Sequence, residues 1–195
     1  MNIRTLTLGA YQTNCYIVSG TPGQCVVIDP GYEAAAILSV LEREGLQAEA
    51  ILLTHGHFDH VGAVKDLARE TNCPVYIHEK ELSLPPVMTA GKLHYTNTCA
   101  EGDTLSLAGL TIRVLETPGH TPGSVCLVCG NYLFSGDTLF AGSCGRVDFP
   151  GSSPRDMVRS LARLAAMEED FTVCPGHGEA STLRAEQAYN PYLRR

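Results

Sequence analysis

Three histidines and an aspartate are packed into the stretch Thr54-His55-Gly56-His57-Phe58-Asp59-His60, directly after the apolar run at residues 50–53. In an extended segment, side chains two residues apart point the same way, so His55 and His57 can reach one metal ion together. Asp59 and His60 lie where the chain is predicted to turn into a helix, so they face another direction. Two ligand pairs with two directions predict a site for two ions, and imidazole with carboxylate suits zinc, iron or manganese. The alternative is a solvated, histidine-rich loop.

The composition is that of one compact domain. The 195 residues are 44% hydrophobic and 18% charged, which predicts a single domain over residues 1–195. The formal net charge is -7, and no stretch gathers lysines and arginines into a stripe, so a nucleic-acid partner is disfavoured. The first residues carry no long apolar segment, and no run approaches about 18 apolar residues. We therefore expect neither secretion nor membrane insertion, and a cytoplasmic location.

Eight cysteines are present, mostly inside apolar, strand-like runs, which predicts buried thiols rather than a disulfide scaffold. Cys126 and Cys129 form a CxxC motif, but strand alternation would send their sulfurs to opposite faces. A zinc or redox role for this pair is not favoured, because no second CxxC completes a four-sulfur site.

The order of apolar patterns predicts a mixed α/β fold. In the first half, short apolar strands alternate with helices predicted at residues 33–44 and 61–70, whereas the second half is rich in strands and closed by a helix over residues 157–165. Two mixed sheets packed face to face with helices outside would bury such apolar strands on both faces. Residues 82–102 show neither the helix nor the strand pattern of apolar residues. This segment predicts either a substrate loop carrying Lys92, His94 and Tyr95 or an ordinary surface loop.

Three further polar residues follow predicted strands of the second half, each beside glycine or proline: His120, Asp137 and His177. Loops at the carboxyl ends of strands converge on one rim of a sheet, where α/β proteins place their sites. With the first stretch they supply seven ligands, which is enough for two ions.

These residues together resemble the metallo-β-lactamase superfamily. The segments 136–140 and 145–149 and the ending from Pro175 to Leu193 are similar to the short glyoxalase II, or hydroxyacylglutathione hydrolase-like, group. The resemblance implies a four-layer αββα sandwich. It also implies two divalent metal ions, zinc first and iron or manganese otherwise. By this resemblance the first ion is held by His55, His57 and His120, the second by Asp59, His60 and His177, and Asp137 bridges both.

The chain departs from two branches of that superfamily. β-Lactamases commonly have cysteine where Asp137 stands, so a drug-hydrolysing role is not expected. Only 18 residues follow His177 in the sequence, too few for the helical C-terminal domain of full-length glyoxalase II. The substrate class is therefore less defined than the chemistry.

The resemblance implies hydrolysis of a small-molecule thioester, such as S-D-lactoylglutathione, by a metal-bridging hydroxide whose proton Asp59 can accept or orient. Arg146 is the candidate contact for a glutathione carboxylate, with a local ion pair to Asp148 as the alternative, and Lys92 and Arg184 are weaker candidates. The metal set is complete without His78 and His94. The oligomeric state stays open.

Two other activities compete with this interpretation. A mononuclear iron persulfide dioxygenase keeps nearly all of the same residues, although Gly178 directly after His177 favours the hydrolase. A nuclease, which also exists among relatives of this kind, is disfavoured by the acidic balance.

Overall fold

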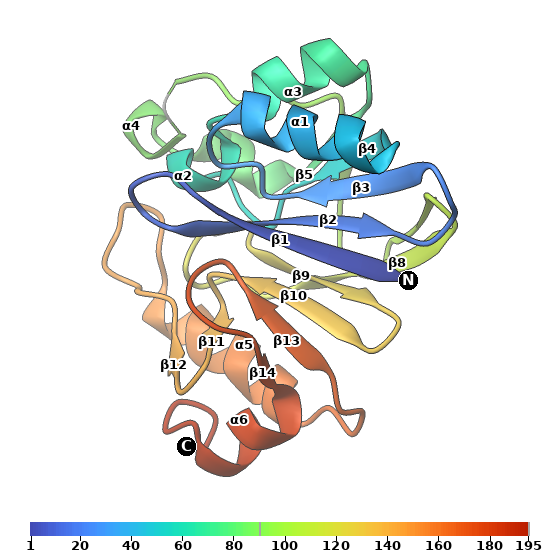
Figure 1. Ribbon diagram of the computed structural model, residues 1–195. Coiled ribbons are helices and arrows are strands. Elements are labelled where there is room, and N and C mark those ends of the chain that lie inside the picture. The colour runs from blue at the N-terminus through green and yellow to red at the C-terminus, as the bar shows by residue number, and fades with distance from the viewer. Residues whose placement is uncertain (90, 195) are drawn as a thin grey trace.

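The computed structural model describes residues 1–89 and 91–194 and has two six-stranded sheets packed face to face (Figure 1). Strand order in the first sheet follows the sequence: β1 (Asn2–Leu8), β2 (Thr13–Ser19), β3 (Gln24–Ile28), β4 (Gln47–Leu52), β5 (Val75–His78) and β6 (Asn97–Cys99). Strands β1 to β3 are antiparallel and β3 to β6 are parallel. The carboxyl ends of β3, β4 and β5 therefore meet at one edge of this sheet.

The second sheet is also mixed. Its strands run in the order β14 (Ser181–Thr182), β13 (Thr172–Pro175), β10 (Tyr132–Gly136), β9 (Val125–Cys129), β8 (Leu110–Glu116) and β7 (Thr104–Leu107). Only β10 and β13 pair in parallel. Their carboxyl ends point to the same edge, so the loops that follow them lie close together.

Helices cover both outer faces, as Figure 1 shows. Helices α1 (Ala34–Glu44) and α3 (Val64–Thr71) pack on the first sheet, and α5 (Pro154–Ala165) and α6 (Leu183–Tyr189) pack on the second. The shorter elements are α2 (Phe58–Val61), η1 (Glu79–Ser83), α4 (Pro86–Thr89) and the hairpin of β11 (Leu139–Phe140) and β12 (Ser143–Cys144). The predicted four-layer αββα sandwich is confirmed.

The core consists of three apolar clusters, one between the sheets and one under each helix layer. Strand β2 shows how the sequence produces this arrangement. Tyr16 and Val18 contribute to the cluster between the sheets, whereas Cys15 and Ile17 contribute to the cluster under α1 and α3. Because alternate side chains face opposite sides, a strand buried on both faces needs an unbroken apolar sequence.

Seven of the eight cysteines are buried, and Cys144 is partly exposed. Cys126 and Cys129 belong to different core clusters on opposite faces of β9. The expectation of buried thiols, and of a CxxC pair that strand geometry splits, is confirmed.

The helix predicted at residues 61–70 is instead two helices, α2 and α3, separated at Gly62 and Ala63. The N–H of Ala63 donates to the carbonyl of Pro30 at 3.0 Å rather than to the preceding helical turn. The backbone of Gly31 packs so closely on the Asp59 carbonyl that an added Cβ would lie 1.7 Å from that oxygen. The turn after β3 therefore interrupts the helix, and Asp59 and His60 lie on the separate first turn.

Several short elements were absent from the sequence-based prediction: α4 and β6 inside residues 82–102, the β11–β12 hairpin, β14 and α6. Strand β6 pairs with β5 and extends the first sheet, so this connection is not a structureless loop.

Candidate metal centre

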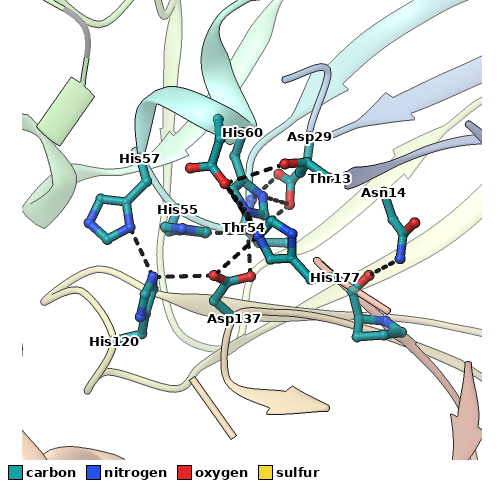
Figure 2. Close-up of polar contacts among 12 residues, drawn as sticks. Thr13, Asn14, Asp29, Thr54, His55, His57, His60, His120, Asp137 and His177 are labelled. Carbon is teal, nitrogen blue, oxygen red and sulfur yellow. Dashed lines mark hydrogen bonds and ion pairs between the residues drawn. The ribbon is translucent and has the colours of Figure 1, made fainter. Parts of the chain in front are cut away.

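Two groups of side chains meet at the edge of the sandwich where the carboxyl ends of the strands converge (Figure 2). The first triplet, His55, His57 and His120, and the second triplet, Asp59, His60 and His177, each have donor atoms within 4.8 Å of one another. His57 Nδ1 lies 2.9 Å from His120 Nε2, and His177 Nε2 lies 3.2 Å from Asp59 Oδ2. The structure thus gathers the residues that the sequence predicted as two ligand sets.

Asp137 lies between the two triplets (Figure 2). Its Oδ1 is 3.4 Å from His60 Nε2, and its Oδ2 is 3.4 Å from His120 Nε2 and 3.6 Å from His177 Nε2. Gly176, just before His177, makes this approach possible, because an added Cβ would lie 2.3 Å from Asp137 Oδ1. One carboxylate therefore faces imidazoles of both triplets.

The donor set fits divalent metal ions. His55 Nε2, His57 Nε2 and Asp137 Oδ1 are buried atoms that have no hydrogen-bond partner among the described residues. Buried polar atoms are normally satisfied, and such exceptions gathered at one place point to an ion or water. Imidazole and carboxylate are ligands of zinc, iron and manganese.

Backbone carbonyls fix the tautomers of two of the histidines. His120 Nδ1 donates to the carbonyl of Arg146 at 2.8 Å, and His177 Nδ1 donates to the carbonyl of Tyr11 at 3.0 Å. A carbonyl can only accept, so in the neutral ring the proton lies on Nδ1 and the lone pair lies on Nε2. In both residues Nε2 is the atom that faces the site, as expected for histidines prepared to bind metal.

Asp29 plays the same role for His60 and was not identified from the sequence. Its carboxylate is 2% exposed and lies 2.9 Å from His60 Nδ1; it also accepts from the N–H and hydroxyl of Thr54 at 2.8 and 2.5 Å. The signal was available, because Asp29 follows β3 at the same edge of the sheet where β4 delivers His55.

In the protein without metal, the histidine pKa values shift in opposite directions in the two triplets. Burial lowers the pKa of His55 well below its ordinary value and that of His57 to about 4, and it also lowers the pKa of His120. Burial acts in the same direction on His60 and His177, but the carboxylates beside them outweigh it and raise both pKa values. The first triplet is therefore neutral near pH 7, the state that binds metal.

A cavity of about 770 Å³ opens beside these residues. Aromatic and apolar side chains from four loops form much of its wall: Tyr11, Phe58, Met88, Phe140 and Phe149. Arg146 also lines the cavity, with its guanidinium 4.1 Å from the centre of the Phe149 ring, and makes two hydrogen bonds of 2.7 Å to Asp148. The ion pair with Asp148, which the sequence offered as the alternative to a substrate contact, is therefore present, and it leaves Arg146 at the cavity.

Comparison with known proteins gives the family. A model described as the metallo-beta-lactamase superfamily matches residues 8–177. The chain belongs to this superfamily. The "Probable metallo-hydrolase YqgX" of Bacillus subtilis is 34% identical over 99% of the chain and 98% of its own length. The "Hydroxyacylglutathione hydrolase" of Pectobacterium carotovorum is 39% identical over 95% of the chain, which spans 70% of that relative.

Solved structures agree with the superfamily fold. BLEG-1, described as a B3 metallo-beta-lactamase, has a TM-score of 0.91 and 34% identity, with all of both chains covered. TTHA1623 in a di-iron-bound form has a TM-score of 0.86 and 40% identity, covering 97% of this chain and all of the other. ETHE1 from Myxococcus xanthus has a TM-score of 0.84 and 27% identity, covering 98% and 84%.

Other polar residues considered from the sequence lie away from this superfamily site. His78 contacts Glu116 at 2.8 Å, and the Arg184 guanidinium pairs with Asp170 at 3.8 Å. Lys92 and Tyr95 line a separate cavity of about 410 Å³, and His94 lines another of about 650 Å³. Among the described residues of segment 82–102, Met88 lines the site cavity, whereas Lys92, His94 and Tyr95, the residues predicted for a substrate loop, line other cavities.

Within the described residues, no helix has the length and apolar character needed to cross a bilayer.

Proposed function

We propose that this member of the metallo-beta-lactamase superfamily is a dinuclear metal-dependent hydrolase of glutathione thioesters, such as S-D-lactoylglutathione. The observation that carries the proposal is the position of Asp137 between two triplets of donor atoms, each suited to one ion. The 39% identity to hydroxyacylglutathione hydrolase supports the substrate class. We assign the first ion to the first triplet, the second ion to the second triplet, and a bridging role to Asp137.

Two bound divalent ions would supply a water molecule activated for attack and would polarise the thioester carbonyl. Asp59 is positioned to take or orient the proton of that water. Its Oδ2 accepts from the Thr13 hydroxyl at 3.3 Å and faces His177 at 3.2 Å. Although burial would raise the pKa of Asp59, the neighbouring His177 and His60 outweigh it and lower the pKa in the metal-free protein, so the carboxylate is ionised and can accept a proton.

The rest of the site would bind and orient the substrate. The apolar wall excludes water and packs against the acyl group, and Arg146 at the rim offers a cation to a glutathione carboxylate. A thiol leaving group has a pKa of roughly 8.5, so it can depart as thiolate with little help from an acid. Zinc is our first choice of metal, with iron or manganese as alternatives, and the di-iron form of TTHA1623 supports the iron alternative.

A mononuclear iron persulfide dioxygenase is the second candidate, and the similarity to ETHE1 fits it equally well. Three parallel assays separate the candidates: loss of S-D-lactoylglutathione, oxygen uptake with glutathione persulfide, and hydrolysis of a β-lactam. The third assay is included because the chain is similar to BLEG-1. Thioester loss with two metal equivalents per chain supports the proposal. Oxygen uptake without thioester loss, or β-lactam hydrolysis alone, would overturn it.

A further inference from the structure

Glu81 is a carboxylate that the metal-ligand assignment leaves unused, although it is completely buried. It lies in η1, directly after β5, and both of its oxygens accept hydrogen bonds from backbone N–H groups. Oε2 accepts from Gly56 at 2.6 Å and Oε1 accepts from Gly123 at 2.7 Å. A buried carboxylate held by main-chain donors rather than by a basic side chain fixes the position of those donors.

The two donors belong to the two loops that carry the first triplet. Gly56 lies between His55 and His57, and Gly123 lies three residues after His120. One loop follows β4 in the first sheet, and the other connects β8 and β9 in the second sheet. Glu81 therefore joins loops that come from opposite halves of the sandwich.

The backbone at both glycines lies close to this carboxylate. An added Cβ at Gly56 would be 3.1 Å from Oε2, and an added Cβ at Gly123 would be 2.8 Å from Oε1. The loops share one more direct link, from the N–H of Val125 to the carbonyl of Thr54 at 2.9 Å. Across this junction His57 Nδ1 and His120 Nε2 face each other at 2.9 Å, so a small shift of either loop changes the geometry offered to an ion.

We propose that Glu81 is a positioning residue for the first metal site, setting the distance between the loop of His55 and His57 and the loop of His120. The proposal rests on metal binding by the first triplet and deepens the proposed function of that site. Glu81 is not one of the proposed ligands. It acts through Gly56 and Gly123, as outer residues that orient metal ligands commonly do.

The test is Glu81→Gln. Glutamine can accept one of the two N–H groups through its oxygen, but its NH2 group would face the other N–H, so one loop is released. Loss of such an outer partner typically costs about 10- to 100-fold in metal affinity. We expect a loss of this size in zinc affinity at the first site, measured by competition with a chelator of known affinity, with zinc content determined by elemental analysis.

A mutant background without the second site and a matched control variant make the zinc measurement specific to the first site. In a His177→Ala background the first site is the one expected to remain, so adding Glu81→Gln should weaken its single zinc equivalent. The matched control is Glu186→Gln. Glu186 is 5% exposed and accepts from the N–H of Gly142 at 2.8 Å and from Asn190 Nδ2 at 2.7 Å. Both of these donors bond to Oε2, which a glutamine oxygen can replace, and the variant should keep wild-type zinc affinity.

Gly123→Ala is a second variant in case Glu81→Gln does not fold. Its new methyl group would push against Glu81 Oε1 at 2.8 Å and His78 Nδ1 at 2.9 Å without removing the carboxylate, and the same loss of first-site zinc is expected. Wild-type zinc affinity in Glu81→Gln, or an equal loss in Glu186→Gln, would overturn the proposal. A wild-type protein that binds no zinc, iron or manganese would instead refute the proposed function itself.

Discussion

Replacing Asp29 by asparagine tests whether the outer carboxylate sets the tautomer of a second-site ligand. Asp29 is paired with three buried groups: the N–H of Thr54, the hydroxyl of Thr54 and Nδ1 of His60. An asparagine side chain keeps the size and one acceptor oxygen but places an NH2 group on the other side. If that NH2 group faces His60, Nδ1 has to accept, and the ring proton moves to Nε2.

This change of tautomer removes a lone pair from the site. His60 Nε2 is the atom that faces Asp137 at 3.4 Å and His177 at 3.4 Å. With a proton there, the nitrogen cannot bind a metal ion. We therefore expect Asp29→Asn to retain the metal of the first triplet and to lose the second, which lowers the metal content from two equivalents per chain to one.

The stability effect distinguishes asparagine from alanine. Asp29→Ala leaves three buried donors without a partner, at about 1–3 kcal/mol each. Partial relaxation reduces the sum, so we expect the free energy of unfolding of the metal-free protein to fall by about 3–5 kcal/mol. Asp29→Asn should cost only about 1–3 kcal/mol, because the bond to the Thr54 N–H survives.

Urea denaturation of metal-free protein and elemental analysis of metal-loaded protein measure the two effects. The reasoning is refuted if Asp29→Asn binds two equivalents with wild-type affinity. It is equally refuted if metal loss in the two variants simply follows their loss of stability, because asparagine should lose the second metal while staying the more stable of the two.

Four further predictions use the same protein. Asp137→Ala should lose both metals and His177→Ala only the second, as elemental analysis would show; a full pair of ions in Asp137→Ala would contradict the bridging role. Asp59→Asn should reduce turnover per bound metal ion, because an amide cannot take the proton of the attacking water; unchanged turnover per ion would leave Asp59 a ligand only. Arg146→Ala should raise KM for a glutathione thioester more than it lowers kcat, and Asp148→Asn, which frees Arg146 from its ion pair, should lower KM; equal KM in all three proteins would exclude this contact. The metal-free protein should lose stability as the pH falls from 6.5 to about 4. In this range the first-triplet imidazoles stay neutral in the folded chain, where the pKa of His57 is about 4, whereas the same histidines of the unfolded chain take up protons. Denaturant titrations across this pH range would detect the loss.

The sequence predicted the layers because each strand carries a strong local signal. The strands around Ile17, Val27 and Ile51 are apolar without interruption, which is the pattern of strands buried on both faces. Helix α1 also ends as predicted, with Gly45 in the left-handed conformation at φ 63°. The seven proposed ligand positions were predictable because each lies in the segment that follows a buried strand.

The features that the sequence did not reveal depend on contacts between distant segments. Helices α2 and α3 are separate because Pro30, about thirty residues earlier in the chain, takes the N–H of Ala63. Strand β6 is only three residues long, too short to show a periodic pattern, and it forms because β5 offers an open edge. Glu81 reads as a solvated residue of a charged turn, and only the packing of two remote glycines onto its carboxylate shows its burial.

The distribution of ligands between the two sheets explains why the fold and the proposed activity depend on each other. The loop and first helical turn after β4, in the first sheet, carry His55, His57, Asp59 and His60, whereas His120, Asp137 and His177 follow strands of the second sheet. Each triplet takes two ligands from the first sheet and one from the second, and the bridging carboxylate also belongs to the second. Under the proposed assignment, neither sheet alone supplies three ligands to either ion. Metal binding at the two proposed sites would therefore require the sandwich to be closed, and its binding energy would add to the apolar contact between the sheets.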